Sequence, residues 1–200
     1  KLIAEAEKYS LAEHGNERLE CYLLLSNMTS LWLLQTTGIP DDLYQKVDVF
    51  ATTQEDFMAK SIFVKLPHIK SPYPALDRKP IDVNSETTVH LVILGKNDLA
   101  EALAINAALV AHYPNYCRDH RLRTRISIVA DDIYEWKDQL IQRYQHLFDN
   151  SYYRIINLEE ENPHCLCHQP MYGKTREDFV DVEWEFVNGN LRNDALRTKL

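Results

Sequence analysis

Hydrophobic and polar positions follow one another along the chain in blocks that predict short strands separated by single helices. The first block predicts a helix at Lys1–Glu13, a strand at Leu19–Leu25, a helix begun by Ser26-Asn27, a strand at Val47–Ala51 and a helix ending near Lys65. Because Leu19–Leu25 is apolar almost throughout, we expect it to be a strand covered on both faces. Thr52 and Glu55 have the spacing of a capping box, which places the start of the last helix there.

A proline-rich stretch interrupts this pattern, which then restarts. Pro67–Asn84 contains four prolines, and proline fixes φ and removes a hydrogen-bond donor, so the stretch predicts an extended connector. We therefore divide the chain into two α/β units, residues 1–79 and 80–200. The second unit contains predicted strands at Thr88–Leu94, Arg125–Ala130, Tyr152–Leu158 and Val180–Val187, with helices at Asp98–Ala111 and Ile133–Phe148.

Strands that alternate with single helices indicate parallel βαβ units with right-handed crossovers. The predicted fold class is therefore α/β, a Rossmann-like three-layer αβα arrangement with a mainly parallel sheet. The two blocks form either one continuous sheet or two Rossmann-like halves. In Val180–Val187, apolar and acidic residues alternate, which predicts an edge-like or antiparallel strand with one wet face.

Composition and charge exclude several classes of function. With 45% hydrophobic and 26% charged residues among 200, the chain has a globular composition. A net charge of -8 argues against a nucleic-acid partner, and no apolar run approaches the roughly 20 residues of a membrane span. The 5 glycines are few for a conventional nucleotide enzyme. The 4 cysteines are too few for a disulfide framework, which favours a reducing, cytoplasmic compartment.

Both ends of the sequence fall inside helical patterns, and Lys1 is not an initiator methionine. Leu191–Leu200 stops within its pattern in the same way. We therefore expect the chain to be a piece of a longer polypeptide. The rest of that polypeptide is then the first expected partner, and a second copy of the chain is an open alternative.

The strongest local motif is the strand Thr88–Leu94 followed by Gly95 and a helix. A strand that runs into glycine and then a helix is typical of the first turn of a dinucleotide fold. Asn97 stands where the fingerprint has its second glycine, and Ala100 stands at the third. Asp98 begins the helix, where a carboxylate caps amide groups that a pyrophosphate would otherwise use. The motif is either a nucleotide site or a self-capped turn.

Asp131 ends the next predicted strand, where an acidic residue accepts hydrogen bonds from ribose hydroxyls in such folds. It lies farther from Gly95 than the roughly 20 residues that are usual. Asp131 or Asp132 has an alternative role as the cap of the helix that begins at Ile133.

Two further clusters have competing interpretations. Arg118–Arg125 contains four arginines between a helix and a strand, so it lies at the amino edge of the sheet, and we interpret it as a solvated loop with a partner-docking patch as the alternative. His164, Cys165, Cys167 and His168 are potential zinc ligands. Four donors within five residues are too compact for a tetrahedral site, so a loop beside the flanking prolines is favoured over a metal site.

The segment Thr88–Ala111, with Leu-Val-Ile-Leu-Gly followed by Leu-Ala-Glu-Ala-Leu-Ala-Ile-Asn-Ala-Ala-Leu, resembles a TrkA-N-type domain, the NAD-binding core of regulators of potassium conductance (RCK). It is similar in particular to the tandem TrkA-N regions of large bacterial proteins with ion-channel-like or RyR modules. The resemblance covers Pro80–Leu158 and makes 1–79 the back half of a preceding, similar domain. It implies a site for NAD or another adenine nucleotide at Gly95, Asn97, Asp98, Ala100 and Asp131.

Three hypotheses about function follow. The first is a non-catalytic regulatory domain of the TrkA-N kind, which senses a nucleotide and biases the rest of a larger protein linked to ion transport. The second is a Rossmann-like scaffold for protein–protein association that binds no nucleotide. The weakest is an NAD(P)-dependent oxidoreductase fragment, because the sequence shows no substrate-domain constellation and no catalytic Tyr/Lys spacing.

Overall fold

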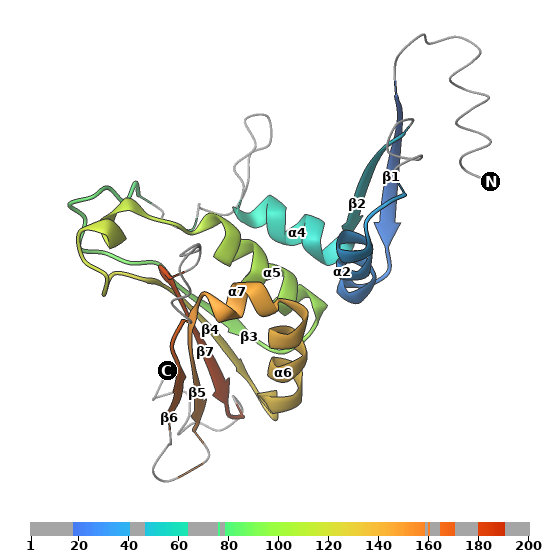
Figure 1. Ribbon diagram of the computed structural model, residues 1–200. Helices are drawn as coiled ribbons and strands as arrows, with labels where there is room; N and C mark the ends of the chain where they lie inside the picture. The colour runs from blue at the N-terminus through green and yellow to red at the C-terminus, as the bar shows by residue number, and fades with distance from the viewer. Residues whose placement is uncertain are drawn as a thin grey trace. The chain divides into compact units, whose positions relative to one another are not determined.

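The computed structural model describes residues 18–40, 47–63, 76, 79–158, 160, 165–170 and 180–190 (Figure 1). The helix predicted at Lys1–Glu13, the pattern at Leu191–Leu200 and most of the proline-rich connector lie outside these residues. Contacts divide the chain into two compact units, Lys1–Phe57 and Met58–Leu200, and the domain boundary at residues 79/80 stays a prediction. Within the described residues, no helix has the length and apolarity needed to cross a membrane.

The first unit contains a two-stranded parallel sheet and a helix that packs on it. Strand β1 (Leu19–Leu25) pairs with β2 (Val47–Thr53), and helix α2 (Met28–Thr37) connects them. The predicted start of α2 is confirmed, because the Ser30 amide donates to Asn27 Oδ1 at 2.8 Å. Met28 and Leu31 of α2 are buried.

The cap of the next helix, α4 (Gln54–Phe63), differs by one position from the predicted capping box. The Asp56 amide donates to Thr53 Oγ1 at 3.0 Å, so Thr53 and not Thr52 accepts the capping bond. β2 is two residues longer than its apolar pattern, and its last residue becomes the cap. The Thr52 hydroxyl donates to Asp56 Oδ2 instead.

One face of the β1–β2 sheet exposes large apolar side chains next to the charged Glu20. Tyr22 and Leu24 of β1 are 72% and 74% exposed, and Phe50, the register partner of Tyr22, is 49% exposed. The Tyr22 and Phe50 rings stack with centroids 5.1 Å apart. We call Tyr22, Leu24 and Phe50 the aromatic face. The prediction that Leu19–Leu25 is covered on both faces is therefore wrong within this unit. An apolar run of residues indicates a strand, but it does not show that a second layer packs on each face.

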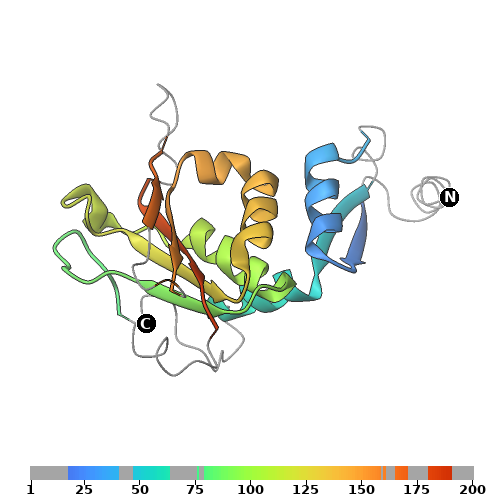
Figure 2. The same ribbon diagram turned by 90° about the horizontal axis from the view of Figure 1, so that it is seen from below.

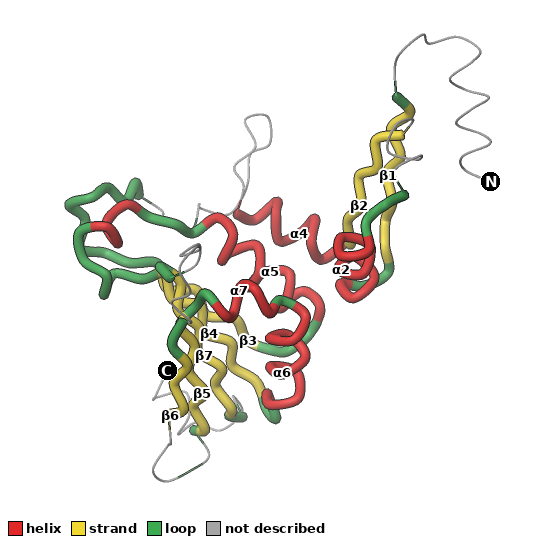
Figure 3. The backbone as a smooth tube through the Cα atoms, in the orientation of Figure 1, coloured by secondary structure: helices red, strands yellow, loops and turns green. Residues whose placement is uncertain are grey.

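The second unit is a Rossmann-like α/β structure with a mostly parallel five-stranded sheet and flanking helices (Figures 1 and 3). Its elements in chain order are β3 (His90–Leu94), α5 (Asp98–Val110), the 3-10 helix η1 (Pro114–Cys117), β4 (Thr124–Ala130), α6 (Ile133–Arg143), α7 (Gln145–Asp149), β5 (Tyr152–Asn157), β6 (Cys165–His168) and β7 (Val182–Asn188). The strand order is β3-β4-β7-β5-β6. The predicted fold class, α/β with a mainly parallel sheet, is confirmed.

β7 occupies the middle of this sheet, parallel to both β4 and β5. The prediction of an edge-like or antiparallel strand is therefore wrong. Its acidic residues alternate with apolar ones because Glu183 and Glu185 pair with arginines of the neighbouring strands, not because they face water alone. The antiparallel edge strand is β6, in the segment predicted as a loop.

The core of the second unit lies on one face of the sheet, under α5, α6 and α7 (Figure 2). Trp184 and Phe186 of β7 are fully buried against Phe148 of α7, whose ring centroid is 4.8 Å from that of Trp184. The single helix predicted at Ile133–Phe148 is broken at Tyr144 into α6 and α7. The break lets the Tyr144 hydroxyl donate to the buried Glu101 carboxylate of α5 at 3.0 Å.

Candidate functional site

The turn after β3 has a backbone conformation that requires glycine. Gly95 has φ +117°, in the region that L side chains rarely adopt. Its amide donates to the Val129 carbonyl of β4 at 2.9 Å, which fixes the turn at the end of the strand pair. A Cβ at Gly95 would meet nothing within 4 Å. The conformation alone therefore demands glycine here, and the space beside it is open.

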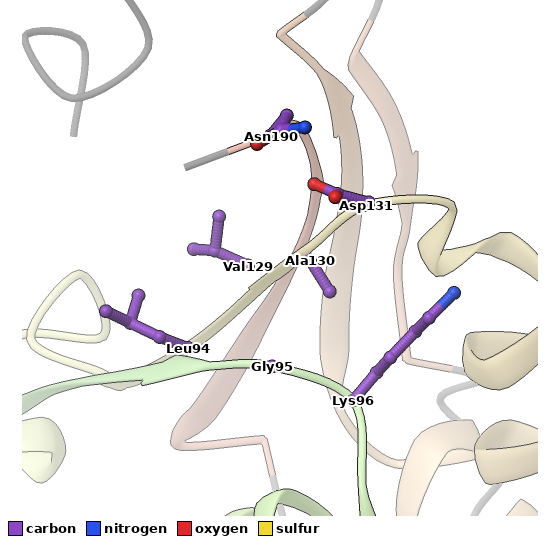
Figure 4. A pocket seen from close by; sticks show the side chains of 7 residues that line it. All are labelled: Leu94, Gly95, Lys96, Val129, Ala130, Asp131 and Asn190. Atoms are coloured by element: carbon purple, nitrogen blue, oxygen red, sulfur yellow. The ribbon is translucent and has the colours of Figure 1, made fainter. Parts of the chain in front are cut away.

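An open crevice of about 360 Å³ lies at this point, at the carboxyl ends of β3, β4 and β7 (Figure 4). Its walls are Leu94, Gly95, Lys96, Val129, Ala130, Asp131 and Asn190. In Figure 4 the Asp131 and Asn190 side chains lie close together at one side, and the Lys96 side chain extends from the loop opposite. Ligands of open α/β sheets bind outside the carboxyl ends of the strands, which is where this crevice lies.

The structure brings only two of the five predicted site residues, Gly95 and Asp131, to the crevice wall. Ala100 is a residue of α5 and is buried in the core. Asn97 is the N-cap of α5, since the Ala100 amide donates to Asn97 Oδ1 at 2.9 Å. The prediction that Asp98 makes this cap is wrong: Asp98 is the first residue of the helix, one position too late for its side chain to act as the N-cap.

The second loop of the crevice connects β4 to α6. Asp132 lies at the N-cap of α6 with φ 50°, and its side chain makes no capping bond. Instead, the Ile133 amide donates to Asn188 Oδ1 at 3.4 Å, so a buried side chain of β7 caps the helix. The prediction that Asp131 or Asp132 caps this helix is therefore wrong, which leaves the Asp131 carboxylate at the crevice wall.

Lys96 joins the two loops and is a crevice residue that the sequence analysis missed. Its Nζ donates to the Asp132 carbonyl oxygen at 2.7 Å. Its position directly after Gly95 was a signal that could have identified it. Asn190, which follows β7, was also missed, because only the central position of β7 brings it there.

The opposite face of the sheet from the core carries paired charges. Arg125 Nε donates to Glu183 Oε1 at 2.5 Å, and Arg154 Nε donates to Glu185 Oε1 at 2.7 Å. The Ser127 hydroxyl also donates to Glu185. We call Arg125, Ser127, Arg154, Glu183 and Glu185 the ion-pair face. Burial alone would raise the pKa of Glu185, but the Ser127 hydrogen bond and the charges of Arg154 and Arg125 together lower it.

The four arginines of the basic cluster all have partners within the second unit. Arg121 pairs with Asp119 at 2.8 Å, which lowers the pKa of that carboxyl to about 2. Arg123 lies 4.0 Å over the Tyr152 ring. Arg118 contacts the Ser85 carbonyl oxygen, and Arg125 pairs with Glu183. These partners favour a structural loop over a docking patch.

The Cys/His segment forms an edge strand. His168 of β6 stacks on Tyr153 of β5 with centroids 4.4 Å apart, and Cys167 is exposed. Neighbouring residues of a strand point to opposite faces, so Cys167 and His168 diverge. No group of three or more potential metal ligands gathers among the residues that the structure describes, and His164 lies outside them.

No protein-family model, no curated protein and no solved structure matches the chain. The fold itself therefore defines the class: a Rossmann-like α/β unit with an open crevice at the carboxyl edge of its sheet.

Proposed function

We propose that the chain is a non-catalytic regulatory module whose crevice beside Gly95 binds an adenine nucleotide, in the manner of TrkA-N-type domains. Binding biases the conformation of the larger bacterial, ion-transport-linked polypeptide to which the module belongs. The observation that carries this proposal is the open crevice beside a glycine held at positive φ.

The two charged groups of the crevice and its glycine each have a use in this proposal. The turn at Gly95 lets a ligand approach the backbone without meeting a side chain. Asp131 offers a carboxylate to ribose hydroxyls, and Lys96 offers a positive charge to phosphate. Leu94 and Val129 supply apolar wall. The residues present therefore fit a nucleotide, although the amide of Ala100 is taken by Asn97.

Calorimetric titration of the 200-residue chain with NAD, NADH, ATP, AMP and cyclic dinucleotides tests the proposal. We expect saturable binding of at least one of them, with thermal stabilisation of about 2.7 kcal/mol at a hundredfold excess over Kd. Gly95→Val should abolish binding, because a side chain strains the turn at φ +117° and occupies the open space beside it. Gly38→Val is the matched control, since Gly38 also has positive φ and nothing within 4 Å of its Cβ position, but lies in the first unit.

The second candidate function, a scaffold for protein association, is favoured by the aromatic face, whose Tyr22 and Leu24 side chains are largely exposed. Absence of binding across the nucleotide panel from a folded sample would contradict the nucleotide module and support the scaffold. Equal binding by wild type and Gly95→Val would place the nucleotide elsewhere.

A further inference from the structure

The crevice beside Gly95 contains a cation, Lys96, that forms no ion pair with a carboxylate among the residues that the structure describes. Among the described residues, the Lys96 ammonium has one partner, the carbonyl oxygen of Asp132 at 2.7 Å. A backbone carbonyl satisfies one of the three donors of an ammonium group but leaves its positive charge in place. The Lys96 side chain therefore starts at the loop after β3 and places its positive charge at the β4–α6 loop, next to the residue Asp131 (Figure 4).

At the same place, fewer free backbone amides are available than a dinucleotide needs for its pyrophosphate. The internal pyrophosphate of a dinucleotide binds the amides of a helix N-terminus, and a second glycine allows its close approach. Here Asn97 carries a side chain at that position, and its Oδ1 already accepts the Ala100 amide. Asp98 adds a negative charge in the first turn of α5.

The chemistry of a terminal phosphate points in the same direction. A terminal phosphate differs from an internal pyrophosphate because it carries about two negative charges on one freely placed group. A single ammonium on a flexible four-carbon stem can reach such a group without close backbone approach.

We propose that Lys96 is the phosphate-binding residue of the crevice, and that the crevice takes a nucleoside monophosphate in preference to a dinucleotide. This inference rests on the proposed function and names the ligand class of the same site. Lys96 exchanges the Asp132 carbonyl for the phosphate, so that the bound anion contacts the side chain and not a glycine-rich backbone loop.

Calorimetry with AMP, adenosine and NAD at low ionic strength tests this inference. We expect the wild type to bind AMP at least tenfold more tightly than either adenosine or NAD. Lys96→Met should reduce AMP affinity to that of adenosine and leave adenosine affinity unchanged. Lys96→Arg should restore most of the difference, because it keeps the charge. Lys79→Met, an exposed lysine of the same unit, is the control and should change nothing.

Asp98→Asn gives a second variant that does not touch the Lys96–Asp132 contact. Removing a negative charge near the phosphate should raise AMP affinity severalfold. Thermal unfolding of each variant without ligand separates a loss of binding from a loss of folding.

The outcomes distinguish the two proposals. If wild type binds AMP or NAD and Lys96→Met binds it equally well, the role of Lys96 is wrong while the nucleotide module stands. NAD binding tighter than AMP overturns the preference for a monophosphate. If no nucleotide binds a folded wild-type chain, the proposed function falls, and this inference falls with it.

Discussion

The two sheets of this chain differ in the side chains that their outer faces present. The first sheet presents the aromatic face, where Tyr22 and Leu24 are more than 70% exposed. The second presents the ion-pair face, where each carboxylate has an arginine within hydrogen-bond distance. Parallel sheets are normally covered on both sides, and contiguous exposed apolar patches mark surfaces that bind something. The carboxylates of the ion-pair face are paired with arginines of the same face, whereas the apolar side chains of the aromatic face remain exposed.

The inner faces of both sheets are alike. Each packs apolar strand residues against helices, through Leu31 of α2 in the first unit and through α5, α6 and α7 in the second. The difference between the sheets is therefore confined to alternate positions of the strands. Substitutions at those positions and at the inner positions of the same strands test whether the contrast is correct.

The largest expected effect is at an inner position of β7. Trp184 is fully buried, so Trp184→Ala should lower the free energy of unfolding of the second unit by about 3–5 kcal/mol. Urea unfolding followed by far-UV circular dichroism measures this loss. A loss below 1 kcal/mol would mean that the ring is not part of a packed core.

The next effect is at the neighbouring outer position of the same strand. Glu185→Gln removes the charge that Arg154 and Ser127 contact, and it should cost about 1 kcal/mol, since the arginines are partly exposed. Because the folded-state pKa of Glu185 is lowered, its contribution is present above the unfolded pKa of about 4.3 and is lost as pH falls through the folded value.

Urea unfolding of wild type and Glu185→Gln at a series of pH values from 7 to 3 checks this dependence. The difference between the two should shrink as the solution is acidified. A difference that stays constant or grows toward low pH would show that the carboxylate is not held ionised by its partners.

A smaller effect separates the two sheets. Leu24→Thr on the aromatic face should change the free energy of unfolding by less than about 0.5 kcal/mol, because the side chain is exposed. Urea unfolding provides the measurement, and Leu23→Thr on the other face of the same strand is the control, expected to cost more. A cost above 2 kcal/mol for Leu24→Thr would mean that the aromatic face is covered.

The smallest effect lies at the amino edge of the second sheet. His112 Nδ1 donates to Asp181 Oδ2 at 2.8 Å, and this hydrogen bond raises the pKa of His112 although burial opposes it. A raised folded pKa gives stability that is fully present below the unfolded pKa of about 6.5 and is lost as pH rises through the folded value.

His112→Asn should therefore lose about 0.3 kcal/mol at pH 5.5 and almost nothing at pH 9, because the imidazole is partly exposed. Thermal unfolding at the two pH values measures the loss. A larger loss at pH 9 than at pH 5.5 would reverse the sign and exclude the charged hydrogen bond.

The sequence predicts individual strands and helix caps better than it predicts which strands lie side by side in a sheet. The strand Leu19–Leu25 and the cap at Asn27 follow from local pattern, and both are confirmed. The central place of β7 does not follow, because its acidic residues find arginines on strands that are distant in the chain. An alternating pattern indicates that one face of a strand is charged. The order of strands in the sheet decides whether those charges contact water or arginines of neighbouring strands.

The candidate site shows the same division. Gly95 is identified by the strand that precedes it, since the turn needs positive φ. Asn190 enters the crevice only because β7 lies beside β4, and Asn188 caps α6 for the same reason. Long-range placement of this kind has no local signal, so Gly95 and Asp131, which directly follow predicted strands, could be predicted and Asn190 could not.

The central claim is that a nucleotide binds beside Gly95. The most direct test is a ¹H–¹⁵N NMR titration of the whole chain with AMP, because only 5 glycines are present and the Gly95 amide can be assigned readily. We expect saturable shifts of the Gly95, Lys96 and Asp131 amides, with the Gly38 amide unchanged. Saturable shifts confined to other residues, or none at millimolar AMP, would contradict it.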